Sequence, residues 1–167
     1  MTGRTRRVAV LAGNPAFGAI LCRSLEDAGF NALNFSQVGP LTTFLRISTV
    51  DTLILDAELP GPSVIDIAKA LRSHQRLASP LFEIVTLTRT RAEFHRPFYD
   101  AGIDLVLEKP LTPARLIASL NERLELDHAI AANDGRRRTD HVKPRSWTAA
   151  LRPRERLNNV IELFSPR

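Results

Sequence analysis

Thr52-Leu53-Ile54-Leu55-Asp56 is the segment that most strongly indicates how this chain folds. An apolar run that ends in a single acidic residue is typical of a buried strand in a parallel sheet. A later run, Val106-Leu107, is followed closely by Lys109-Pro110. Because the carboxyl ends of parallel strands meet at one edge of the sheet, we expect Asp56 and Lys109 to lie together there. The pair would place a carboxylate beside an ammonium group.

On both sides of this segment, short apolar runs alternate with amphipathic segments along the chain. This alternation is the pattern of repeated βα units, and it predicts an α/β fold with a doubly wound, five-stranded parallel sheet of the flavodoxin-like type. The ligand site of such a sheet lies outside the carboxyl ends of its strands. The expected strands are Val8–Leu11, Ala32–Phe35, Thr52–Leu55, Glu83–Leu87 and Leu105–Leu107.

The expected helices carry their own start signals. Pro15 stands at the first position of the first helix, where its missing N–H costs nothing. A short second helix is expected after Gly39-Pro40, and a fourth over Ala92–Ala101 that is irregular because it contains Pro97. N-caps are expected at the polar residues Asn14, Ser63 and Thr112.

Composition sets the class of protein. Apolar residues make up 44% of the 167, which is ordinary for a packed globular protein. Cys22 is the only cysteine, so an intramolecular disulfide is excluded, and we expect a packing role in a reducing compartment. No apolar stretch approaches the roughly 20 residues that span a bilayer. We therefore expect a soluble, cytoplasmic protein without a membrane partner.

The charge divides the chain into three parts. Basic and acidic residues balance over 1–127, so the formal net charge of +5 belongs to 128–167. We predict a domain at 1–127, a flexible basic linker at 128–152 and a short amphipathic C-terminal helix at 153–167. Basic residues surround Trp147 in this extension, a composition that can engage a phosphate backbone, although positive linkers commonly stay solvated.

Several motifs occur in a fixed order along the chain, and together they indicate a family. They are Leu53-Ile54-Leu55-Asp56 followed by Leu59-Pro60-Gly61, then Ile84-Val85-Thr86-Leu87-Thr88, then Ala101-Gly102-Ile103-Asp104 leading to Lys109-Pro110-Leu111. With these motifs the chain from about Arg7 to Leu126 resembles the receiver domain of two-component response regulators. The resemblance implies a non-enzymatic signalling module whose partner is a protein, such as a histidine kinase or a downstream regulator. It also implies a surface that some members use for homodimers.

The resemblance assigns roles to individual residues. Asp56 would be the phosphoacceptor, Thr88 the switch hydroxyl and Lys109 the phosphate ligand, although Lys109 paired with Asp56 as a structural remnant is an equal alternative. The spacing also leaves Thr86 or Thr90 open as the counterpart of Thr88. Phosphorylation would add about −1.5 to −2 charge at this edge of the sheet.

Other positions depart from the family's pattern. Ala12 and Gly13 stand where the resemblance implies two acidic metal ligands. Mg²⁺ prefers carboxylate oxygens, so Asp56 and Glu58 are the remaining candidate ligands, and we expect weak metal binding and no resident cofactor. Arg89 follows Thr88 where the family has a small side chain. We predict that Arg89 pairs with Asp56 and gates the pocket.

Three functions follow from this sequence. The first is an atypical receiver that signals in a phosphorelay pathway by protein–protein interaction, with no dependence or weak dependence on phosphorylation. The second is a single-domain response regulator phosphorylated on Asp56. The third is a nucleic-acid-associated regulator that uses the basic extension.

Overall fold

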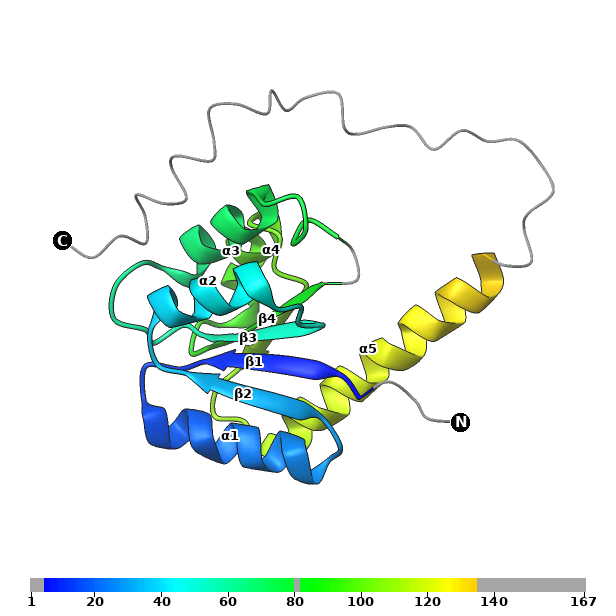
Figure 1. The fold of residues 1–167 in the computed structure, drawn as a ribbon, viewed down its shortest axis with the longest axis horizontal. Helices are drawn as coiled ribbons and strands as arrows, with labels where there is room; N and C mark the ends of the chain where they lie inside the picture. Colours follow the sequence, from blue (N-terminus) through cyan, green and yellow to red (C-terminus); the bar gives the residue numbers. More distant parts are fainter. Residues whose placement is uncertain (1–4, 80–81, 135–167) are drawn as a thin grey trace.

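One five-stranded parallel sheet forms the centre of the structure, with its strands in the order β2-β1-β3-β4-β5 (Figure 1). The computed structural model describes residues 5–79 and 82–134. All neighbouring strands pair in parallel, which confirms the predicted doubly wound α/β fold. The strands are β1 (Arg7–Leu11), β2 (Asn31–Phe35), β3 (Thr52–Asp56), β4 (Glu83–Thr88) and β5 (Leu105–Glu108).

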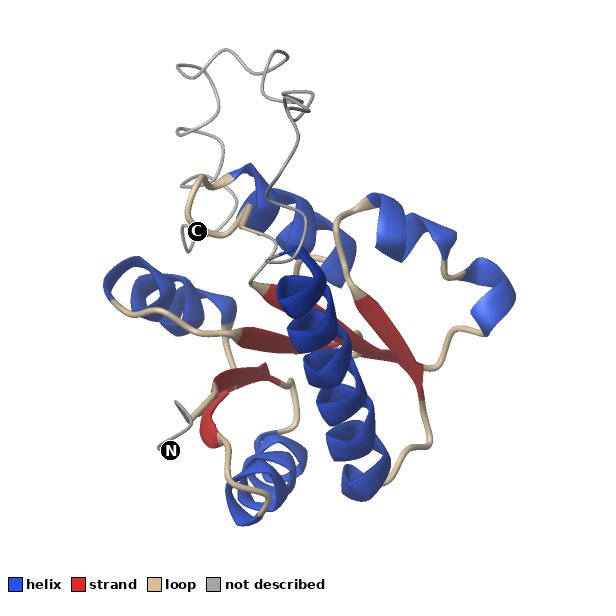
Figure 2. Cartoon of the chain, turned by 90° about the vertical axis from the view of Figure 1, so that its right-hand side faces the viewer, coloured by secondary structure: helices blue, strands red, loops and turns tan. Residues whose placement is uncertain are grey.

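Helices cover both faces of the sheet (Figure 2). They are α1 (Pro15–Asp27), α2 (Val38–Ile47), α3 (Val64–Ser73), the 3₁₀ helix η1 (Ala92–Phe94), α4 (Arg96–Asp100) and α5 (Pro113–Asp134). Helices α1 and α5 pack on one face, and α2, α3 and α4 pack on the other. No helix in the described part of the chain is long and apolar enough to cross a membrane.

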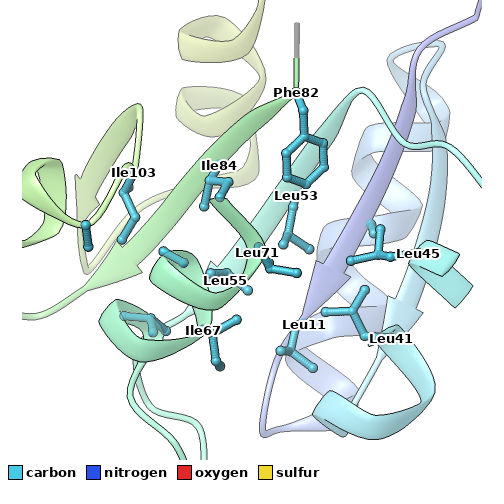
Figure 3. Close-up of a cluster of buried hydrophobic side chains, with 14 of the residues drawn as sticks. Leu11, Leu41, Leu45, Leu53, Leu55, Ile67, Leu71, Phe82, Ile84 and Ile103 are labelled. Carbon is cyan, nitrogen blue, oxygen red and sulfur yellow. The ribbon is translucent and has the colours of Figure 1, made fainter. Parts of the chain in front are cut away.

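Alternating side chains of the central strands fill two separate cores. On β3, Leu53 and Leu55 point toward α2 and α3, while Ile54 points toward α1 and α5. Figure 3 shows the first of these clusters, in which the large aliphatic side chains of Leu11, Leu53 and Ile67 are almost completely buried. Burial of each such side chain contributes about 1.5–3 kcal/mol, so these two cores hold the strand ends in fixed positions.

The predicted N-caps form. The Asn14 side chain accepts hydrogen bonds from the backbone nitrogens of Ala16 and Phe17, at 3.0 and 3.2 Å. Ser63 caps α3 by accepting from the nitrogen of Asp66 at 3.2 Å. The Thr112 hydroxyl accepts from the nitrogen three residues later, at 3.3 Å. These bonds satisfy N–H groups that the first turn of a helix leaves without partners.

Helix boundaries differ from the predictions at three places. Helix α2 begins at Val38, so Pro40 lies in its first turn, where its missing N–H is not needed. The expected fourth helix is divided into η1 and α4, which meet at His95, in agreement with its predicted irregularity. Helix α5 continues to Asp134 and so covers the first seven residues of the predicted linker at 128–152, because neither glycine nor proline interrupts 114–134.

The remainder of the predicted extension lies outside the described residues. This holds for 135–152 of the basic linker and for the predicted helix at 153–167. Figure 1 shows that α5 runs beyond the edge of the sheet before the described chain ends. The domain boundaries within the extension, other than the longer α5, stay predictions.

Arg72 fixes the end of the sheet that lies away from Asp56. From α3, its guanidinium donates to the backbone oxygens of Leu77, Phe82 and Gly102, each at 2.8 Å. It also donates to the Asp104 carboxylate at 2.5 Å. One side chain therefore ties α3 to the segments that precede β4 and β5.

Candidate functional site

Asp56 and Lys109 meet at the carboxyl edge of the sheet, as the sequence predicts. Asp56 ends β3, and Lys109 follows β5 and donates its backbone N–H to the oxygen of Thr88 at 2.7 Å. The Lys109 ammonium is 2.6 Å from Oδ1 of Asp56, and the exposed fractions of the two side chains are 10% and 5%. Oδ1 also accepts the backbone N–H of Glu58 at 3.0 Å. The Asp56 carboxylate is thus both buried and paired.

Glu58 shares the same ammonium group. Nζ of Lys109 lies 2.9 Å from Oε2 of Glu58 and 4.9 Å from the centre of the Phe17 ring. The hydrogen bond and the charge of Lys109, followed by those of Arg89, hold the pKa of Glu58 below its usual range. Lys109 therefore has two carboxylates and one aromatic face as neighbours.

Arg89 takes a different partner from the one we predict. Its Nε donates to Oε1 of Glu58 at 2.6 Å, and no bond joins it to Asp56. The expected Asp56–Arg89 pair is wrong because Lys109 reaches the buried Asp56 from β5, whereas Arg89 lies on the outer side. The exposed fractions of Arg89 and Glu58 are 75% and 49%. A gating role for Arg89 stays a prediction.

Four charged side chains are linked by ion pairs in one row. The order along it is Asp56, Lys109, Glu58 and Arg89, with N–O distances of 2.6, 2.9 and 2.6 Å. Two carboxylates and two cations balance, so the row is neutral without any further ion. We call it the rim cluster.

Thr88 is placed at the edge of the sheet but points its hydroxyl into a local turn. The Thr88 oxygen is 3.0 Å from the hydroxyl of Thr90 and accepts the Thr90 backbone N–H at 3.1 Å. Thr88 lines a cavity of about 480 Å³ beside α3, whereas Asp56 lines a neighbouring one of about 460 Å³. Of the alternatives, Thr86 is completely buried within the sheet, two residues before the edge. The role of Thr88 as the switch hydroxyl stays a prediction.

The cavity beside Asp56 is open to solvent and has mixed walls. Phe17, Pro110 and Leu111 supply its apolar surface, and the rim cluster supplies its charged surface. Phe17 comes from the first turn of α1, whose start Asn14 fixes. The cavity thus combines an apolar wall with charged groups that already neutralise one another.

Three observations bear on how well the residues at this edge suit a Mg²⁺ ion. A Cβ atom at Gly13 would lie 2.9 Å from Cδ of Pro60 and 3.0 Å from the backbone oxygen of Glu58. Ala12 is completely buried and has no side-chain oxygen. Within 5–79 and 82–134, no group of three His, Cys, Asp or Glu residues could hold a metal ion. The predicted metal roles of Asp56 and Glu58 stay predictions, and this geometry weighs against them.

His95 is a buried residue near the same edge of the sheet, and the sequence pattern assigns it no role. Its Nε2 lies 2.7 Å from the backbone oxygen of Thr90, which requires that Nε2 carries the donated proton. The same atom is 3.9 Å from Oε1 of Glu108, and the ring packs edge-on against Phe98. A buried histidine thereby joins the segment after β4 to the end of β5. No sequence motif marks it.

Comparison with known proteins gives the family. The model of the response regulator receiver domain matches residues 8–121. The chain belongs to this family. It is therefore a receiver domain of two-component signal transduction, a type of domain that is typically not a catalytic enzyme.

Individual relatives agree with this assignment. The chain is 28% identical over 125 residues to the transcriptional regulatory protein GltR of Pseudomonas aeruginosa, a match that covers 74% of this chain and 51% of GltR. The chain thus spans about half the length of this curated relative.

Two solved structures are similar in fold. The chemotaxis response regulator CheY4 of Vibrio cholerae gives a TM-score of 0.65 at 21% identity, covering 71% of this chain and 98% of CheY4. A CheY-like receiver domain protein of Methanospirillum hungatei gives 0.66 at 17% identity, covering 75% and 98%.

Proposed function

We propose that this receiver domain acts by protein–protein interaction that depends weakly, or not at all, on phosphorylation of Asp56. The observation that carries the proposal is the rim cluster. The Lys109 ammonium contacts Asp56 at 2.6 Å and Glu58 at 2.9 Å, so the group that would bind a phosphoryl oxygen already has two carboxylate partners.

Access to Asp56 supports the same proposal. An attacking carboxylate oxygen must reach the phosphorus atom in line with the leaving group. Oδ1 of Asp56 accepts two hydrogen bonds, and only 5% of the side chain is exposed. Little of the carboxylate is therefore open to a phosphoryl donor, which limits its phosphorylation.

Charge neutralisation is the second support. Phosphoryl transfer is accelerated mainly by positioning and by cations that neutralise the phosphoryl oxygens, a role that a divalent ion supplies in many enzymes. Ala12 offers no ligand, and Pro60 with the Glu58 backbone fills the space beside Gly13. The residues that remain are the members of a neutral ion cluster. Binding a protein partner through a surface that does not change on phosphorylation requires no such cation.

The runner-up is a working phosphoacceptor. It is favoured by the short contact between Lys109 and Asp56 and by the position of Thr88 at the same edge of the sheet. A kinase that displaces Glu58 while it docks would expose the acceptor. In either case the partner we propose is a protein of a two-component pathway, such as a histidine kinase or a downstream regulator.

Phosphodonor labelling separates the two. The full chain is incubated with acetyl phosphate, with and without Mg²⁺, and its intact mass is compared with that of Asp56→Asn. We expect no adduct in a sample whose fold is verified by circular dichroism. An adduct that requires Mg²⁺ and disappears in Asp56→Asn would overturn the proposal and establish the runner-up.

A further inference from the structure

We propose that the Glu58 side chain is an internal competitor for oxyanions. Its carboxylate fills the place of an external carboxylate or phosphate between Lys109 and Arg89, and this place becomes a binding site when Glu58 leaves. The inference rests on the proposed function, because it explains why the cations at this edge of the sheet are already paired in the isolated chain.

The geometry around Glu58 is that of a bound anion. Its two oxygens take separate cations, Oε2 from Lys109 at 2.9 Å and Oε1 from Arg89 at 2.6 Å. Charge-assisted hydrogen bonds of this kind are the strong type, and a guanidinium paired with an ammonium is a common arrangement for binding phosphate or carboxylate. Glu58 thus satisfies the two cations that an incoming oxyanion would need.

The burial of the three groups differs, and this decides which of them can move. Only 10% of the Lys109 side chain is exposed, against 49% of Glu58 and 75% of Arg89. The backbone N–H of Glu58 remains bonded to Asp56, so the loop can stay in place while the side chain rotates outward. Lys109 is therefore the fixed half of the site. The exposed side chains of Glu58 and Arg89 can both move, and it is the departure of Glu58 that would leave the two cations without a carboxylate between them.

Space for the incoming group is already present. The cavity of about 460 Å³ adjoins Glu58, Lys109 and Arg89 and is bounded by Phe17 and Leu111. An oxyanion on a larger molecule could place its charge at the cations and its attached carbon atoms against the apolar wall. The chemistry fits a carboxylate of a protein partner as well as inorganic phosphate.

The test uses the full chain and amide NMR titrations. Wild type, Glu58→Gln and the control Glu93→Gln are each titrated with inorganic phosphate, and in a second arm with a tetra-glutamate peptide. Glu93 is exposed in η1 outside the rim cluster, so its substitution changes the net charge equally. Saturation with phosphate alone identifies a free-anion site, whereas saturation with the peptide identifies a site for protein carboxylates.

We expect Glu58→Gln to bind at least one probe about tenfold more tightly than wild type or Glu93→Gln, with shifts at the amides of Arg89 and Lys109. Adding Lys109→Met should abolish this gain. Equal affinity in wild type and Glu58→Gln, repeated with Glu58→Ala, would overturn the proposal. Because the readout is non-covalent, the outcome is independent of acetyl phosphate labelling, and either proposal can fail alone.

Discussion

Replacing Lys109 by methionine should destabilise the domain more than any other single substitution in the rim cluster. Methionine keeps most of the aliphatic stem that packs at the edge of the sheet, so the change removes mainly the charge. The Asp56 carboxylate would then be left in place, with 5% of its side chain exposed and no cation within bonding distance.

The magnitude follows from this burial. Removing one member of a buried ion pair typically costs 3–5 kcal/mol, because the remaining charge is left uncompensated. Asp56 keeps one hydrogen bond, from the backbone N–H of Glu58, so we expect a loss near the lower limit, about 3 kcal/mol. In Lys109→Met/Asp56→Asn no buried charge is left, and about 1–2 kcal/mol of this loss should be recovered.

Urea unfolding at pH 7, followed by circular dichroism, measures the effect. The slope of the free energy against urea must stay constant, so that the midpoint reports stability alone. Arg89→Met serves as the matched control, since it removes one cation from the same cluster at a position that is 75% exposed. If Lys109→Met costs no more than Arg89→Met, or if the double variant is less stable than Lys109→Met, the uncompensated Asp56 charge is not the cause of the loss.

Three further predictions concern single positions. Gly13→Asp should lose about 1–3 kcal/mol of stability, as overpacked cores do, because its Cβ would collide with Pro60. A magnesium titration of this variant followed by NMR should show no gain in binding. The control Gly39→Ala should not be destabilised, since the added Cβ meets nothing within 4 Å. Because the pKa of Glu58 is lowered in the folded chain, its stabilising contribution is complete above its usual pKa of 4.5 and is lost as the pH falls below that value. The difference in stability between wild type and Glu58→Gln should therefore shrink in melting curves recorded in acid. A constant difference down to pH 3 would contradict this. Burial, followed by the charge of Glu26, raises the pKa of Cys22 to about 11. Iodoacetamide at pH 8 should therefore react about a hundredfold faster with the urea-unfolded chain than with the native chain. Equal rates would show that the thiol is accessible in the native chain.

The strands and caps were predictable because each has a local cause. Uninterrupted apolar runs such as Leu53–Leu55 leave a buried parallel strand as the favourable arrangement, and Asn14 before Pro15 marks a helix start in the sequence itself. The meeting of Asp56 with Lys109 was predictable for a topological reason, since both follow strands whose carboxyl ends share one edge.

The partners within the rim cluster were not predictable in the same way. Which acid Arg89 pairs with depends on how far its side chain extends from β4 and on Lys109 having already reached Asp56, and neither follows from sequence order. The close approach of Pro60 to Gly13 joins residues 47 positions apart in the numbering, and no periodicity marks it. The position of His95 depends on the break between η1 and α4, which Pro97 signals only approximately.

The contact of Gly13 with Pro60 has a consequence for how this chain can change. A side chain at position 13 would place its Cβ 2.9 Å from the proline ring and 3.0 Å from the backbone oxygen of Glu58, so the loop between β3 and α3 must shift to accept it. The chemistry of position 13 is therefore coupled to the packing of this loop. Restoring an acidic pair at this edge depends on how readily the loop moves as well as on which side chain is introduced.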